Sequence, residues 1–106
     1  MQYKTHNQDD LINSSGTWLL TTINLPFHKI AATLGDPIRF KPEEADKIRV
    51  EWDIQFEDGL VATIYDWKEH KRAPEEVTDW HIGGRGFEVV QRVYDLLGSK
   101  NTSLTY

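Results

Sequence analysis

The chain of 106 residues contains no cysteine, so it can form neither disulfides nor thiolate metal sites. It also lacks any apolar run near the roughly 20 residues that span a bilayer, and its start, MQYKTHNQDD, is too polar for a signal peptide. We therefore expect a soluble cytoplasmic protein without membrane contact. The length and the hydrophobic content of 39% fit one compact domain.

An excess of positive charge is missing as well. Lys and Arg number 12 against 17 Asp and Glu, which gives a formal net charge of -5 at pH 7. Broad binding to the phosphates of nucleic acids needs a basic face. We therefore do not expect a nucleic-acid partner, although a local basic site stays open.

No pattern of catalytic residues is present either. The four histidines lack the paired spacing of a metal site, and no nucleophile stands with a base in a known motif. Glu51 opposite Tyr65 is interpreted as part of a surface ladder, because catalytic carboxyl groups need a cleft that shifts their pKa values. We expect a protein that is not an enzyme and that uses no metal or other cofactor.

The clearest pattern lies in residues 46–68, DKIRVEWDIQFEDGLVATIYDWK. Apolar and polar residues alternate up to Phe56, and Asp58-Gly59 follows, which predicts a β-hairpin. A two-residue turn would place Phe56 opposite Val61, whereas a three-residue loop would place it opposite Leu60. We favour the three-residue loop because it gathers only aliphatic and aromatic side chains on one face.

The favoured register has a consequence for the second arm of the hairpin. It moves Tyr65 and Trp67 to the other face, beside Glu51 and Arg49, where Arg49 could lie over the Trp67 ring. A slip by one residue would exchange the two faces. Apolar residues thus remain outside the core in either register.

Four further elements are predicted around this hairpin. They are strands over residues 17–25 and 78–82, and helices over residues 26–34 and 87–97 that carry apolar stripes and end at glycines. Residues 1–16 are predicted as a flexible arm and residues 99–106 as a flexible tail. A single domain then covers residues 17–98.

The order of these elements, β-α-β-β-β-α, predicts an α+β two-layer sandwich. Its sheet would be mainly antiparallel, with the helices on one face. The other face would be uncovered, and exposed apolar residues there favour a partner. We expect that partner to include a second copy of the chain, as a homodimer or higher homo-oligomer.

Two groups of residues are candidates for binding. Gly83 and Gly84 precede the second helix, so their N-H groups could hold an anion with help from Arg85 and His81, although a plain tight strand-to-helix turn is the preferred interpretation. The second group is a possible aromatic platform with basic neighbours, whose alternative interpretation is core or interface. It comprises Tyr65, Trp67, Trp80 and His81, with Lys68, Lys71, Arg72 and Arg85.

Three motifs resemble a pattern found in small uncharacterised proteins of tailed bacteriophages. They are F-x-D-G-x-x-A-T-I-Y-D-W-K at Phe56 to Lys68, W-x-I-G-G at Trp80 to Gly84, and L-G-D-P at Leu34 to Pro37. The resemblance covers residues 17–97 and transfers no functional residue. It implies an early or accessory phage product acting in the cytoplasm of a bacterial host.

With this resemblance, we expect an accessory protein that binds and inhibits or modulates a host bacterial protein, such as one of anti-phage defence. The contact surface would be the exposed sheet face and the loops around residues 65–86. One alternative is a sponge for a nucleotide-like small molecule, in which Gly83, Gly84 and Arg85 hold phosphate and Trp67, Tyr65 or Trp80 stacks on the base. Another is a virion or assembly component.

Overall fold

The computed structural model of the protein describes residues 2–98. Its elements, in chain order, are β1 (Tyr3–Thr5), β2 (Trp18–Asn24), α1 (Phe27–Leu34), β3 (Ile38–Arg39), β4 (Val50–Phe56), β5 (Val61–Tyr65), the 3-10 helix η1 (Pro74–Glu76), β6 (Asp79–Gly84) and α2 (Glu88–Leu97).

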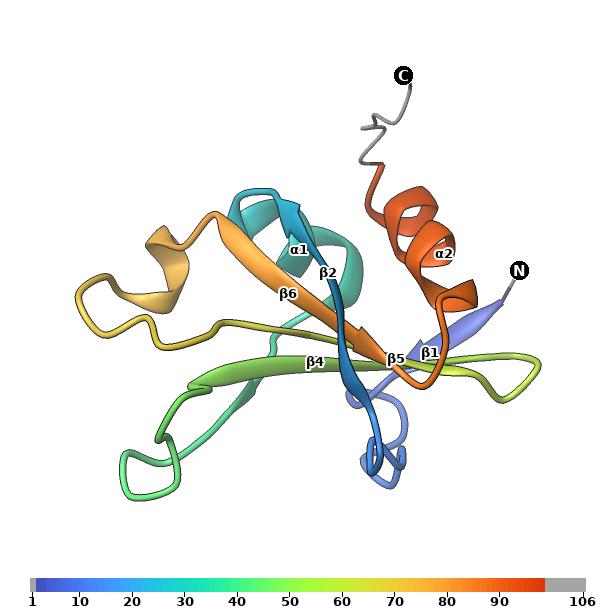
Figure 1. The fold of residues 1–106 in the computed structure, drawn as a ribbon, viewed down its shortest axis with the longest axis horizontal. Helices are drawn as coiled ribbons and strands as arrows, with labels where there is room; N and C mark the ends of the chain where they lie inside the picture. Colours follow the sequence, from blue (N-terminus) through green and yellow to red (C-terminus); the bar gives the residue numbers. More distant parts are fainter. Residues whose placement is uncertain (1, 99–106) are drawn as a thin grey trace.

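The strands form one antiparallel sheet in the order β1-β4-β5-β6-β2, and the short β3 also pairs with β4. Both helices cover the same face of this sheet (Figure 1). The α+β fold with helices on one face, predicted from the sequence, is therefore confirmed. The sheet face opposite the helices is called the outer face below.

The hairpin of β4 and β5 adopts the register that the sequence favoured. Trp52 pairs with Ile64 and Ile54 pairs with Ala62, and the N-H of Phe56 donates to the carbonyl oxygen of Leu60 at 2.8 Å. The loop reverses at Gly59, which has a φ of 90°, a conformation that glycine adopts without strain. The shorter loop would have brought polar Thr63 to the core face.

Between the sheet and the helices lies a core built around two tryptophans. Trp52 and Trp80 meet edge to face, with ring centroids 5.3 Å apart, and both side chains are fully buried. Each indole N-H is satisfied by a backbone carbonyl, that of Gly35 for Trp52 and that of Leu25 for Trp80. A buried indole needs such a partner, so these bonds tie the chain around α1 to the sheet.

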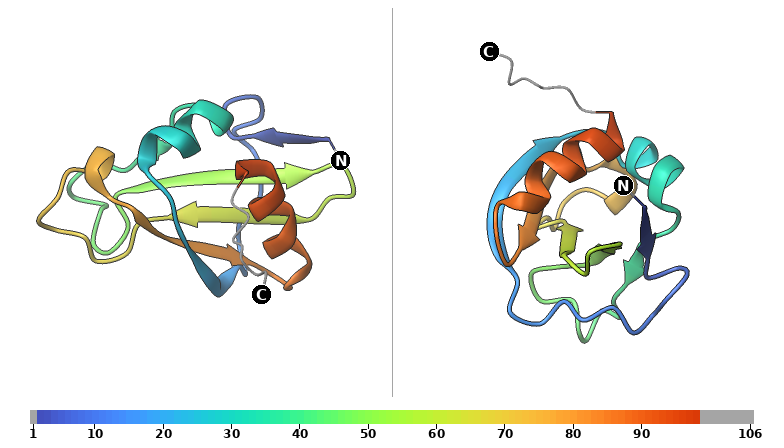
Figure 2. Two further views of the ribbon diagram at one scale, coloured as in Figure 1. Left: turned by 90° about the horizontal axis from the view of Figure 1, so that it is seen from above. Right: turned by 90° about the vertical axis from the view of Figure 1, so that its right-hand side faces the viewer.

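Residues 1–16 were predicted as a flexible arm, and this prediction is wrong for the described residues. β1 pairs with the edge of β4, and the β1–β2 loop, residues 6–17, then crosses the outer face to reach β2 on the far side (Figure 2). Local composition hid this because the segment is held by long-range bonds, such as the N-H of His6 donating to the carbonyl of Asp53 at 3.1 Å. The domain thus includes the chain from residue 2 onward, and the predicted tail, residues 99–106, lies outside the described residues.

The predicted strand at residues 78–82 is two residues too short at its end. β6 includes Gly83 and Gly84, and the turn to α2 begins at Arg85. A Cβ atom on Gly83 would lie 2.5 Å from the hydroxyl oxygen of Thr63, and one on Gly84 would lie 2.7 Å from a methyl group of Val89. The glycines therefore allow close approach within the sheet and under α2.

Candidate functional site

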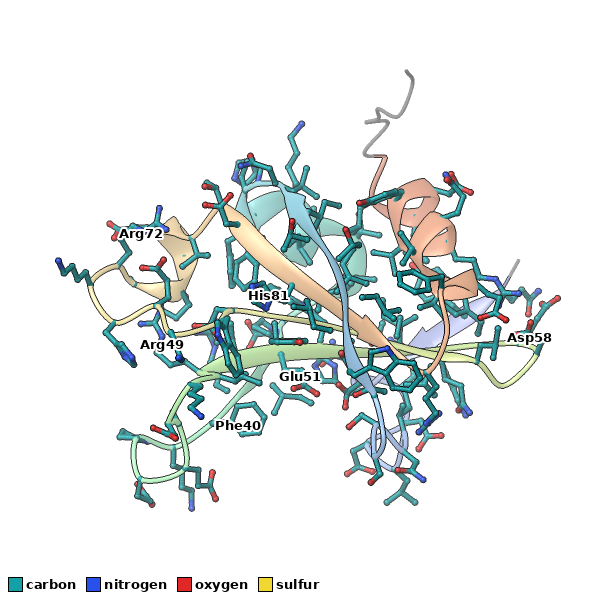
Figure 3. All side chains as sticks on the ribbon, in the orientation of Figure 1. Phe40, Arg49, Glu51, Asp58, Arg72 and His81 are labelled. Carbon is teal, nitrogen blue, oxygen red and sulfur yellow. The ribbon has the colours of Figure 1, made fainter. Side chains whose placement is uncertain are left out.

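The outer face collects side chains from the middle strands of the sheet. Because alternate residues of a strand point to opposite faces, the register that buries Trp52 and Ile64 turns their neighbours outward. The outward residues are Glu51 and Asp53 on β4, Thr63 and Tyr65 on β5, and His81 on β6. Figure 3 shows Glu51 and His81 in this central region of the sheet.

Three of the predicted platform residues form an aromatic cluster on this face, namely Tyr65, Trp67 and His81. The rings of Trp67 and His81 are stacked, with centroids 5.9 Å apart and an interplanar angle of 21°. Tyr65 meets both edgewise, at 5.4 Å from His81 and 6.4 Å from Trp67. The contacts hold Trp67 in one orientation although 41% of its surface is exposed.

Trp80, the fourth predicted platform residue, does not belong to the cluster. It has no exposed surface and packs against Trp52 on the helix face. The prediction that its ring could meet a ligand is wrong, because Trp80 and His81 are consecutive residues of one strand and so point to opposite faces. The aromatic cluster thus has three members.

Cations do lie over the Trp67 ring, but they are not the one expected. The ammonium groups of Lys47 and Lys68 each lie 5.8 Å from the ring centroid. Arg49 instead donates from Nε to a carboxylate oxygen of Asp66 at 3.0 Å. A fully buried carboxylate such as that of Asp66 needs a charged partner, which explains why Arg49 turns away from Trp67.

Asp66 also fixes the backbone that leads into β4. One of its carboxylate oxygens accepts the N-H of Arg49 at 2.8 Å and the N-H of Val50 at 3.1 Å. Asp66 stands between Tyr65 and Trp67 in the chain, so the same bonds hold the end of β5 and the start of the aromatic cluster. No periodic pattern along the chain predicts this pairing of Asp66 with Arg49.

The glycine-rich segment does not form the predicted anion site. Gly83 and Gly84 lie inside β6, away from the first turn of α2, which starts at Glu88. Arg85 donates from Nε to the carbonyl oxygen of Ser15 at 2.9 Å and from Nη2 to that of Asn13 at 2.6 Å. Its guanidinium thus fastens the β1–β2 loop instead of facing an open anion site.

The remaining basic candidates lie on the segment between β5 and β6. Arg72 pairs with Glu69 through Nη2 at 2.7 Å, and Lys71 is exposed. Lys68 is therefore the member of this group that reaches the aromatic cluster, together with Lys47, which was not among the predicted site residues. Lys47 lies 20 positions before Trp67 in the chain, and only the folding of the hairpin brings the two side chains together.

A surface hollow of about 330 Å³ adjoins Trp67. Apolar side chains of Phe40, Ile48 and Trp67 contribute to its lining, and charged residues complete it. These charged residues are Glu44, Asp46 and Lys47. Trp67 thus takes part in both the aromatic cluster and a concave region large enough for one or two side chains of a partner.

The titrating groups of the outer face are shifted by their surroundings. Burial, followed by the neighbouring carboxyl group of Asp53, raises the pKa of Glu51 to about 9. Burial lowers the pKa of His81, and the charge of Asp66 partly offsets this. Burial and then the charge of Glu51 raise the pKa of Tyr65. Glu51 was predicted to be part of a surface ladder, and this prediction is wrong, because its carboxyl group is half-buried beside that of Asp53.

Within residues 2–98, no group of three or more potential ligands is arranged to hold a metal ion. No helix in that part of the chain is long and apolar enough to cross a membrane. The fold and the site together define a small α+β protein with a partly exposed aromatic cluster on the outer face of its sheet. Comparisons with family models, with curated proteins and with solved structures found no match.

Proposed function

We propose that the protein is a non-catalytic binding protein whose contact surface is the aromatic cluster and the hollow beside it. The observation that carries this proposal is Trp67, which is 41% exposed whereas Trp52 and Trp80 are fully buried. Contacts with His81 and Tyr65 hold its ring, so a partner would not have to order it on binding. Exposed, well-held aromatic residues are typical anchors of protein interfaces.

The proposed partner is a protein of a bacterial host, in keeping with the resemblance to small phage proteins. A hollow of about 330 Å³ next to an aromatic anchor suits an apolar side chain of that partner. Lysine and carboxylate groups at the rim, Lys47, Lys68, Glu44 and Asp46, supply polar contacts of both signs. Rim charges of this kind set the orientation and the rate of association more than the affinity.

A matched pair of substitutions tests this surface. Trp67→Ala should abolish capture of the partner from a bacterial lysate, whereas Trp18→Ala, a control with 53% exposure at the start of β2, should retain it. Thermal unfolding of both variants is the accompanying measurement. If Trp67→Ala cost as much stability as a core deletion, about 3 to 5 kcal/mol, Trp67 would be a structural residue and the proposal would fail.

A nucleotide-like small molecule is the second candidate ligand, supported by the two ammonium groups beside Trp67. A base could stack on the indole ring while Lys47 and Lys68 meet its phosphates. Arg85 has no part in this version because the β1–β2 loop occupies its donors. Native mass spectrometry of the purified protein should then show co-purified mass of nucleotide size, which Lys68→Ala should reduce.

A further inference from the structure

One carboxylate on the outer face is buried without a hydrogen-bond donor. Asp53 is only 6% exposed, and its Oδ1 atom has no partner among the described residues. The backbone of Asp53 is satisfied by His6, whose N-H donates to its carbonyl and whose Nδ1 accepts its N-H at 3.4 Å. A buried charged oxygen without a donor is costly, so we expect a neighbouring group to donate a proton to Asp53 Oδ1.

Glu51 is the neighbouring group that can carry this proton. It lies two residues before Asp53 on β4, on the same face, and is half-buried. Within residues 2–98, neither carboxyl group forms an ion pair with a lysine or arginine. Two adjacent carboxyl groups without a cation cannot both ionise cheaply.

The elements packed around the pair bring few other titratable groups. On β5, Tyr65 pairs with Glu51 and Thr63 pairs with Asp53, and on β6 His81 pairs with Tyr65. On the other edge, β3 places Ile38 beside Glu51, next to Arg39, whose guanidinium is bound to Asp36 and Glu75. β1 places Lys4 beside Gln55, and Lys4 is paired with Asp9. The β1–β2 loop adds His6, at the amide of Asp53.

We propose that Glu51 and Asp53 share a single proton at neutral pH, with the Glu51 carboxyl as donor and Asp53 Oδ1 as acceptor. The hydrogen bond satisfies the orphan oxygen, and the pair then carries one negative charge under the aromatic cluster. The raised pKa of Glu51, at about 9, agrees with this assignment. The inference goes beyond the proposed binding function and does not depend on it.

Because of the shared proton, the free energy of unfolding should decrease as the pH rises toward 9. The folded protein keeps the proton up to a pH near 9, while the unfolded chain releases it near the ordinary value of 4.5. Because only the folded state holds the proton in between, each rise of one pH unit multiplies the unfolding constant by about ten. Measurement between pH 7 and 9 avoids the titration of unperturbed histidines, near 6.5.

The test is urea unfolding at several pH values between 7 and 9, for the wild type, Glu51→Gln and Glu43→Gln. The Glu51→Gln amide still donates to Asp53 and has no proton to lose, so this variant should lack the tenfold change per pH unit. The exposed control, Glu43→Gln, should keep it. Equal pH dependence in the wild type and Glu51→Gln would overturn the proposal.

A second measurement needs no variant and covers the case in which Glu51→Gln fails to fold. In the folded wild type, the side-chain carboxyl carbon of Glu51, followed by ¹³C NMR, should titrate with a midpoint near 9. A midpoint near 4.5, the ordinary value for a glutamate, would show that the pair shares no proton. Either result decides the assignment regardless of whether a binding partner is found.

Discussion

At the scale of single residues, Asp66 helps to position the candidate site although it is not part of the aromatic cluster. Its buried carboxylate joins Arg49 and the start of β4 to the chain between Tyr65 and Trp67. The position of the aromatic cluster therefore depends on a fully buried charge next to it in the chain. Removing this charge should loosen the hairpin where the proposed contact surface begins.

We expect Asp66→Asn to destabilise the protein by roughly 3 kcal/mol, because it leaves the partly buried Arg49 without its counter-charge. The new amide also turns N-H donors toward groups that are donors themselves. Glu69→Gln is the matched control, since its ion pair with Arg72 lies at the surface, where such pairs contribute little to stability. Chemical unfolding measures both, and equal losses would refute this role for Asp66.

At the scale of elements, the hairpin could be predicted from the sequence and β1 could not. Alternation from Lys47 to Phe56 reports on the hairpin directly, because each residue's face follows from its position in the strand. β1 has only three residues and a polar composition, and it becomes a strand by pairing with the edge of β4. Such pairing has no local signal.

Removal of residues 1–5 tests whether β1 is an integral strand. The deletion exposes the edge of β4 at Ile54 and Phe56, which pair with β1, and it removes the two hydrogen bonds that Thr5 donates to the side chain of Gln8. We therefore expect a clear fall in melting temperature. Lys4→Ala is the control, because it removes only an exposed ion pair and leaves the backbone pairing intact. An unchanged melting temperature after the deletion would contradict this role of β1 and support the flexible arm predicted from the composition.

The candidate site shows the same division between periodic and non-periodic information. Tyr65 and Trp67 were predicted to leave the core because the register fixes their face. Trp80 does not join them, because it precedes His81 directly in β6 and therefore points to the opposite face. The hydrogen-bond partners of Arg49 and Arg85 are brought to them by loops from other parts of the chain. No pattern of residue types along the chain predicts these long-range contacts.

At the scale of the whole molecule, His81 and Glu51 make stability depend on pH with opposite signs. The lowered pKa of His81 means that the unfolded chain binds its proton more readily, so the stabilisation from neutral His81 is complete above about 6.5 and is lost as the pH falls. Glu51 is stabilising while protonated, and that contribution is lost as the pH rises from about 4.5 to 9.

His81→Gln should separate these two contributions. The variant cannot take up a proton, so as the pH falls from 6.5 to 5 its free energy of unfolding should rise relative to that of the wild type, in which the His81 loss opposes the Glu51 gain. Its decline in stability between pH 7 and 9 should be unchanged. Urea unfolding followed by far-UV circular dichroism at each pH provides the comparison. If the free energy of unfolding changed equally with pH in the variant and the wild type between pH 6.5 and 5, His81 would not be held neutral by its burial beside Tyr65 and Trp67.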